Sequence, residues 1–118
     1  MANTQQYLFE RLDAYRVARD ALRPVIAYRA RLRGLPGEGA SQLERATVST
    51  VANIAEATGR NTPADRRNRF AIARAEANEA GAMVEIVALY GVFSNEDYRT
   101  LRSSFQRVTY MLTALMRR

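Results

Sequence analysis

Apolar residues recur every three or four positions along most of this chain, and polar residues fill the positions between them. That spacing is the period of an α-helix, whereas a half-buried strand would alternate at every second residue. The most regular stripe, with spacings of 3, 4, 3, 4 and 3, consists of Tyr98, Leu101, Phe105, Val108, Leu112 and Leu115. The pattern predicts an all-α fold, with helices over about residues 8–33, 41–58, 63–91 and 95–117.

Local start and stop signals fall between these segments. Glycine and proline are dense from Gly34 to Gly39, which predicts a loop. Gly59 predicts the end of the second helix, in the left-handed conformation that glycine favours at helix C-termini. The predicted starts of the last three helices are a capping box of Ser41 with Glu44, Thr62 before Pro63, and Ser94.

The first predicted helix contains a proline. Its core stripe comprises Ala14, Ala18, Ala21, Val25, Tyr28 and Leu32, and Pro24 lies within it. A proline inside a helix removes one backbone hydrogen bond and bends the axis. We therefore expect a kink at Pro24, and the alternative is two shorter helices that meet at this residue.

Short turns join the four segments, which brings consecutive helices back alongside one another. The 118 residues therefore predict a single domain, 1–118, folded as an up-down-up-down antiparallel four-helix bundle with a kinked first helix. The third helix is unusually rich in alanine. Because small residues at helical spacing let helix axes approach closely, we expect tight packing of this helix, within the bundle or between subunits.

Composition argues against most enzyme classes. The chain has no Cys and no His, so it lacks thiolate nucleophiles, the commonest zinc ligand and the histidine of a Ser-His-Asp triad. The third helix carries three glutamates, Glu76, Glu79 and Glu85, but without histidine partners we do not expect a metal site. We expect no enzymatic activity and no cofactor.

Hydropathy and the N-terminus bear on localisation. No apolar run reaches the ~20 residues that a membrane-spanning helix requires, so no membrane association is expected. The first residues, Met1 to Gln6, are polar and lack the apolar block of a signal peptide. These features predict a cytoplasmic protein.

Arginine accounts for all 18 basic residues, against 12 acidic ones, which gives a net charge of +6. One interpretation of this bias is a GC-rich genome, and the other, which does not exclude the first, is that guanidinium groups bind phosphates through paired hydrogen bonds. The candidates for binding RNA or DNA are the arginine groups that acidic neighbours compensate least, namely Arg60, Arg66 and Arg67, followed by Arg29, Arg31 and Arg33.

A polar stripe accompanies the apolar seam of the second helix, because Asn53, Glu56 and Arg60 lie at positions i, i+3 and i+7. One interpretation is a ligand pocket. We favour the other, a structural cluster of Asn53, Glu56 and Arg45, because buried polar groups in bundles need partners. In that cluster Glu56 pairs with Arg45 or Arg60, and Asn53 bonds a neighbouring helix.

Several short motifs resemble one bacterial family. They are Phe9-x-x-Leu12-Asp13-x-Tyr15, Gln42-Leu43-x-Arg45-Ala46-x-Val48-Ser49, Ala52-Asn53-Ile54-Ala55-Glu56, Gly59-Arg60, Phe70 and Ser94-x-Glu96-x-Tyr98. With these motifs the chain resembles the four-helix-bundle family named after proteins encoded in intervening sequences of large-subunit ribosomal RNA genes. That family is similar to the accessory variability protein of diversity-generating retroelements. The chain departs from the family's usual residues at Pro24, Val51, Ala57 and Ala75-Glu76.

The resemblance implies a cyclic homo-oligomer, a homopentamer with a basic surface, and a role linked to nucleic acid. It supplies no catalytic residue. Two functions therefore stay open. The first is a non-enzymatic basic scaffold that binds RNA or DNA through surface arginines, by phosphate contacts because aromatic residues are few. The second is an interaction module whose protein partner, such as a reverse transcriptase, carries the chemistry, with no direct contact to nucleic acid.

Overall fold

Five α-helices and one short 3₁₀ helix make up the part of the chain that the structure describes, and this part contains no strand. The computed structural model describes residues 5–118, so residues 1–4 of the predicted domain lie outside it. In chain order the elements are η1 (Leu8–Arg11), α1 (Asp13–Ala27), α2 (Arg29–Arg33), α3 (Gly39–Thr58), α4 (Pro63–Ala88) and α5 (Asn95–Met116). The all-α prediction is confirmed for the described residues.

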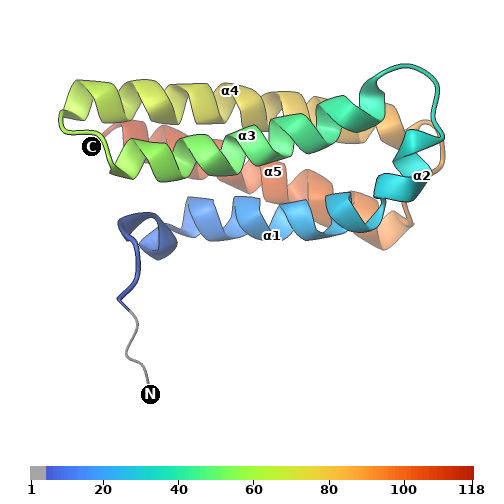
Figure 1. The fold of residues 1–118 in the computed structure, drawn as a ribbon, viewed down its shortest axis with the longest axis horizontal. Coiled ribbons are helices and arrows are strands. Elements are labelled where there is room, and N and C mark those ends of the chain that lie inside the picture. Colours follow the sequence, from blue (N-terminus) through green and yellow to red (C-terminus); the bar gives the residue numbers. More distant parts are fainter. Residues whose placement is uncertain (1–4) are drawn as a thin grey trace.

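The four long helices, α1, α3, α4 and α5, lie side by side, and each runs back along the one before it (Figure 1). Helix α4 packs against α3 and α5, and α1 closes the arrangement because it contacts both α3 and α5. The short α2 follows α1 at one end. At the other end, η1 lies near the turn between α3 and α4 and the last residues of α5.

The core is built from the predicted apolar stripes. On α5, Leu101, Phe105, Val108 and Leu112 are buried. On α4 the buried side chains are Phe70, Ala73, Ala77, Ala80, Met83, Val84 and Val87. Three of these seven buried side chains are alanines, which lets the neighbouring helices approach α4 closely at these positions. None of the described helices combines the length and the apolar character that crossing a membrane requires.

The single helix expected over 8–33 is wrong, because this segment is divided into η1, α1 and α2. Pro24 lies inside α1, and the break comes four residues later, at Tyr28. A tertiary contact accounts for the position of the break. The Tyr28 hydroxyl donates to an Asp97 carboxylate oxygen at 2.6 Å, and its ring packs edge-on against Phe93. The alternative of two helices that meet at Pro24 is also wrong, because α1 continues past Pro24 to Ala27.

Two of the three predicted helix caps are confirmed. The Thr62 hydroxyl accepts a hydrogen bond from the Asp65 amide at 3.1 Å, and the Ser94 hydroxyl accepts one from the Asp97 amide at 3.1 Å. The predicted Ser41 cap is wrong. Helix α3 begins at Gly39, two residues earlier, and the Ser41 hydroxyl donates to the Glu38 carbonyl instead.

The prediction that Gly59 adopts the left-handed conformation is also wrong. Gly59 has φ −90°, an ordinary right-handed value, whereas Gly91 has φ +73° at the turn that follows α4. That turn begins earlier than expected, because α4 ends at Ala88 and not at residue 91. Gly37, in the loop before α3, has φ +77°.

An ion pair ties α2 to α3. The Arg29 guanidinium donates to both carboxylate oxygens of Glu44, at 2.8 and 2.7 Å. These hydrogen bonds lower the pKa of Glu44 below its ordinary value of 4.5. Glu44 is therefore engaged with α2, and not with the N-terminus of α3 as the predicted capping box required.

This ion pair predicts a pH-dependent stability. Because the pKa of Glu44 is lower in the folded chain, its contribution is present above the unfolded pKa and is lost as the pH falls through the folded value. We expect Glu44→Gln to lower the free energy of unfolding at neutral pH by up to about 1 kcal/mol, as for other part-exposed pairs. Urea unfolding should show the variant and the parent converging in strong acid. Glu38→Gln removes an exposed carboxylate that forms no ion pair among the described residues, so as a control it should lower the free energy of unfolding at neutral pH less than Glu44→Gln does.

Gly81 gives a second stability prediction. It lies inside α4, and an added Cβ would meet the Phe105 Cβ at 3.7 Å, an ordinary contact. Because glycine inside a helix costs about 0.5–1 kcal/mol relative to alanine, we expect Gly81→Ala to raise the free energy of unfolding by roughly that amount. Thermal and urea unfolding measure it. A lower stability would mean that α4 and α5 are closer at this point than the structure has them.

Candidate functional site

A cleft lies at the end of the molecule where η1, the turn between α3 and α4, and the last residues of α5 meet. Its volume is about 600 Å³. Four arginines line it, Arg11, Arg66, Arg67 and Arg118, and its apolar lining consists of Leu8, Leu12, Pro63, Phe70 and Leu115. We call this the basic cleft. Thr58 completes the lining, which therefore contains no acidic side chain.

The four arginines of the basic cleft come from three different segments of the chain. The Thr62 cap and Pro63 start α4, which places Arg66 and Arg67 on its first turns. Arg11 is the last residue of η1, and Arg118 follows the end of α5. Sequence analysis selected Arg66 and Arg67 but missed Arg11 and Arg118. No local signal could have found these two, because only the packing of η1 and α5 brings them to α4.

The charge in the basic cleft is largely uncompensated. Across residues 5–118, none of its four arginines forms an ion pair with a described carboxylate. Arg66 donates through one Nη to the Arg60 backbone carbonyl at 3.0 Å, which fixes its position without neutralising it. Four arginine residues beside one concave, mostly apolar surface give that end of the molecule an excess of positive charge, which attracts anions.

Arg60 itself belongs to a different arrangement. Its guanidinium donates to Glu56 at 2.5 Å, and Arg69 of α4 approaches the other Glu56 oxygen at 3.5 Å. Asn53 accepts from Arg69 at 3.3 Å and donates to the Ser49 carbonyl at 2.9 Å. The predicted polar cluster therefore forms around Asn53 and Glu56, and its contact to a neighbouring helix is through Arg69.

Arg45 is not part of that cluster, and its predicted pairing with Glu56 is wrong. The two residues are 11 positions apart on one helix, which separates them by about 16 Å along the axis. Arg45 instead reaches across to α4, where it lies 2.8 Å from Glu79 and 3.9 Å from Glu76. Glu85, the third glutamate considered as a metal ligand, accepts from Tyr98 at 2.8 Å and pairs with Arg102 at 3.0 Å.

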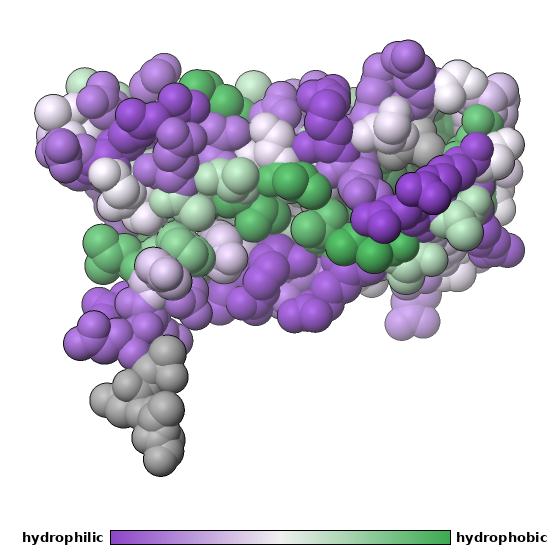
Figure 2. All heavy atoms as spheres, viewed as in Figure 1, coloured by the Kyte–Doolittle hydropathy of each residue, from purple (hydrophilic) through white to green (hydrophobic). Residues whose placement is uncertain are grey.

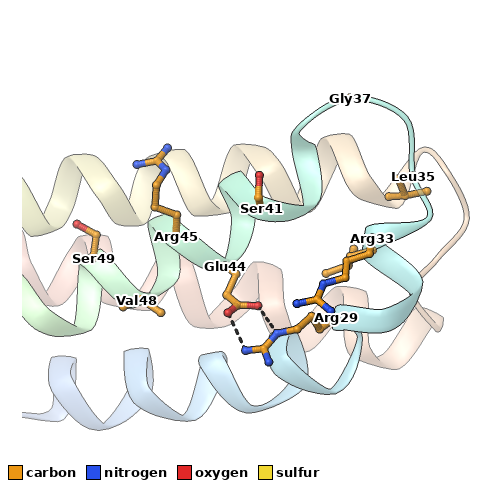
Figure 3. A pocket seen from close by; sticks show the side chains of 10 residues that line it. Arg29, Arg33, Leu35, Gly37, Ser41, Glu44, Arg45, Val48 and Ser49 are labelled. Carbon is orange, nitrogen blue, oxygen red and sulfur yellow. Dashed lines mark hydrogen bonds and ion pairs between the residues drawn. The ribbon is translucent and has the colours of Figure 1, made fainter.

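The second predicted arginine group lies at the opposite end, beside a pocket of about 660 Å³ between α2 and α3. Figure 3 shows Arg29 and Glu44 facing each other across this pocket, with Arg33 nearby. Arg29 is neutralised by Glu44, and Arg31 donates to the Val92 carbonyl at 3.3 Å and lies outside the lining. Since one of its arginines is already paired with a carboxylate in the lining, this pocket attracts anions less than the basic cleft does.

Comparison with known proteins agrees with the helical architecture. A family profile described as 23S rRNA-intervening sequence protein matches residues 10–114. The fold is similar to that of a protein with unknown function from the S23 ribosomal protein family of Bacteroides thetaiotaomicron, with a TM-score of 0.80 and 20% sequence identity. That similarity covers 89% of this chain and 99% of the other. None of the curated proteins is significantly similar to the sequence.

At 20% identity the structural similarity concerns the fold alone. The family profile is more informative, because the residues it matches include η1 from Glu10 on, four of the five α-helices in full and most of α5. They also include three of the four arginines of the basic cleft, Arg11, Arg66 and Arg67. Since the match extends over most of the chain, this protein belongs to the 23S rRNA-intervening sequence protein family.

Proposed function

We propose that this protein is a cytoplasmic, non-enzymatic basic scaffold, assembled as a homopentamer, that binds RNA or DNA by phosphate contacts through surface arginines. The observation that carries the proposal is the basic cleft. Four arginines converge there without an acidic residue in the lining. The name of the family, which refers to 23S rRNA, is consistent with such a ligand.

A site that binds phosphates through arginine needs few other polar side chains, and the cleft has few. Arginine donates in a planar fork that matches two phosphate oxygens. Besides the arginines, Thr58 is the sole polar side chain in the lining, so few groups are available to read a base edge. Binding should therefore be insensitive to sequence and strongly dependent on salt, because bound arginines release counterions from the nucleic acid.

The first test is the double substitution Arg66→Ala/Arg67→Ala. Each lost phosphate contact should remove on the order of 1 kcal/mol, so the affinity for an RNA or DNA oligonucleotide should fall by about tenfold or more. The slope of log affinity against log salt should also flatten, by about 0.7 per lost contact on a single strand. Fluorescence anisotropy over a range of salt concentrations measures both.

Arg99→Ala/Arg107→Ala is the charge-matched control, because both residues are exposed on α5 and lie outside the basic cleft. The control should keep most of the affinity. Equal losses in the two variants would mean that net charge, and not the cleft, governs binding. Absence of binding by the parent protein at low salt would overturn the proposal.

An exposed apolar stripe on α4 supports the homo-oligomer. Ile72, Ala75, Ala82 and Ile86 are exposed and, with Glu79, follow one another at spacings of 3, 4, 3 and 4. By helical geometry this stripe lies on the side of α4 opposite to the buried stripe. Ile72 is 37% exposed and Ile86 46%. The four exposed apolar residues of this stripe, which Glu79 interrupts, favour contact with another copy.

Ile72→Glu/Ile86→Glu tests this interface. A pair of charges in an apolar contact should dissociate the assembly, because removing carboxylates from water is costly. Light scattering during size exclusion gives the mass, and circular dichroism checks that the helices persist. Ile26→Glu on α1, where the isoleucine is 45% exposed, is the control. Dissociation by Ile26→Glu alone would place the contact on α1, and a monomeric parent protein would contradict the homo-oligomer.

A protein-interaction module is the second candidate function, and a separate apolar surface favours it. Figure 2 shows an apolar band along the seam between α1 and α3. Ile26 on α1 and Val48 on α3 are 45% and 46% exposed. If this band binds a partner such as a reverse transcriptase, Val48→Glu should abolish that binding and leave the oligonucleotide affinity unchanged.

A further inference from the structure

We infer that the basic cleft takes an unpaired nucleotide, so that the protein prefers single-stranded nucleic acid to an intact duplex. This inference rests on the proposed function and adds the form of the ligand. Its basis is the combination, in one concave site, of an arginine rim with an apolar lining.

The shape of the site is the first argument. A volume of about 600 Å³ lies in the range of sites that enclose small organic ligands, roughly 300–1,000 Å³. A duplex is convex, and its bases are paired and stacked, so it can touch the arginines but leaves a concave site unfilled. An unpaired nucleotide can turn its base out of the strand and enter the cleft.

The apolar lining is the second argument. Leu8 is 62% exposed, and Leu12 and Leu115 are half-buried, so they offer apolar surface to a ligand. A phosphate makes no favourable contact with such a surface. The flat face of a base can pack against it, because that face is apolar while the edges of the base are polar. Guanidinium planes can also stack on the base. Phe70, only 6% exposed, supports the floor of the cleft from below.

The free donors of the arginines are the third argument. A guanidinium has five N–H groups, and Arg66 uses one of them on the Arg60 carbonyl. The remaining donors of Arg66, and those of Arg11 and Arg67, have no carboxylate partner among the described residues. The site can therefore bind a phosphate at its rim while the attached base covers the leucines.

The test compares one oligoribonucleotide as a single strand and as a blunt duplex, by fluorescence anisotropy at matched salt. We expect the single strand to bind about tenfold tighter or more, the effect of burying one base. Adenosine monophosphate should displace the single strand. Adenosine and inorganic phosphate should each require a much higher concentration, because each satisfies only one half of the site.

Leu8→Ser isolates the apolar half of the site. The position is exposed, so the fold should persist, and we expect the affinity for the single strand to fall more than the affinity for the duplex, which lowers the preference. Ile26→Ser, at an exposed position on α1 outside the cleft, is the matched control and should change neither affinity.

Equal affinities for single strand and duplex, with both lost in Arg66→Ala/Arg67→Ala, would overturn this inference and leave the proposed function standing. Failure of adenosine monophosphate to displace the strand, or an unchanged preference in Leu8→Ser, would also overturn it. Absence of binding to either form would overturn the proposed function, and this inference with it.

Discussion

The packing of α3 against α4 is the contact on which the rest of this structure depends. It is the most extensive helix–helix contact in the described chain, and small side chains make it close. Two threonines of α3, Thr47 and Thr50, are fully buried, which would be costly if their hydroxyls had no partner. Each donates at 2.7 Å to a carbonyl one turn back, so the polar groups are satisfied within α3. The interface can therefore combine close approach with an apolar character.

This contact also sets the register of the charged residues along the two helices. Because α3 and α4 run in opposite directions from one short turn, residues near the turn on one helix face residues near the turn on the other. Glu56 accordingly meets Arg69, while Arg45, farther from the turn, meets Glu79. The flanks are thus bridged by ion pairs, whereas the four arginines beside the turn, η1 and the end of α5 form no ion pair with a described acidic side chain.

The arrangement separates two kinds of arginine in a chain that has no other basic residue. Arg29, Arg45 and Arg102 hold one element to another through Glu44, Glu79 and Glu85. Such part-exposed pairs contribute little to stability individually, so they act mainly on register. The arginines of the basic cleft form no ion pair with a described acidic side chain, so they do not hold one element to another in this way.

Sequence by itself determined the all-α class and most of the limits of α3, α4 and α5, but not the division of residues 8–33 into η1, α1 and α2. The 3–4 spacing of apolar residues identified the buried stripes of α1 and α5, and the side-chain caps at Thr62 and Ser94 marked two helix starts, because both signals are local. Tertiary structure alone decided the break at Tyr28, which follows from a bond to Asp97, 69 residues away. It also decided that Glu44 binds Arg29, that Arg45 binds Glu79, and that Arg11 and Arg118 join Arg66 and Arg67. These outcomes depend on which helices become neighbours, and the period of one helix carries no information about that.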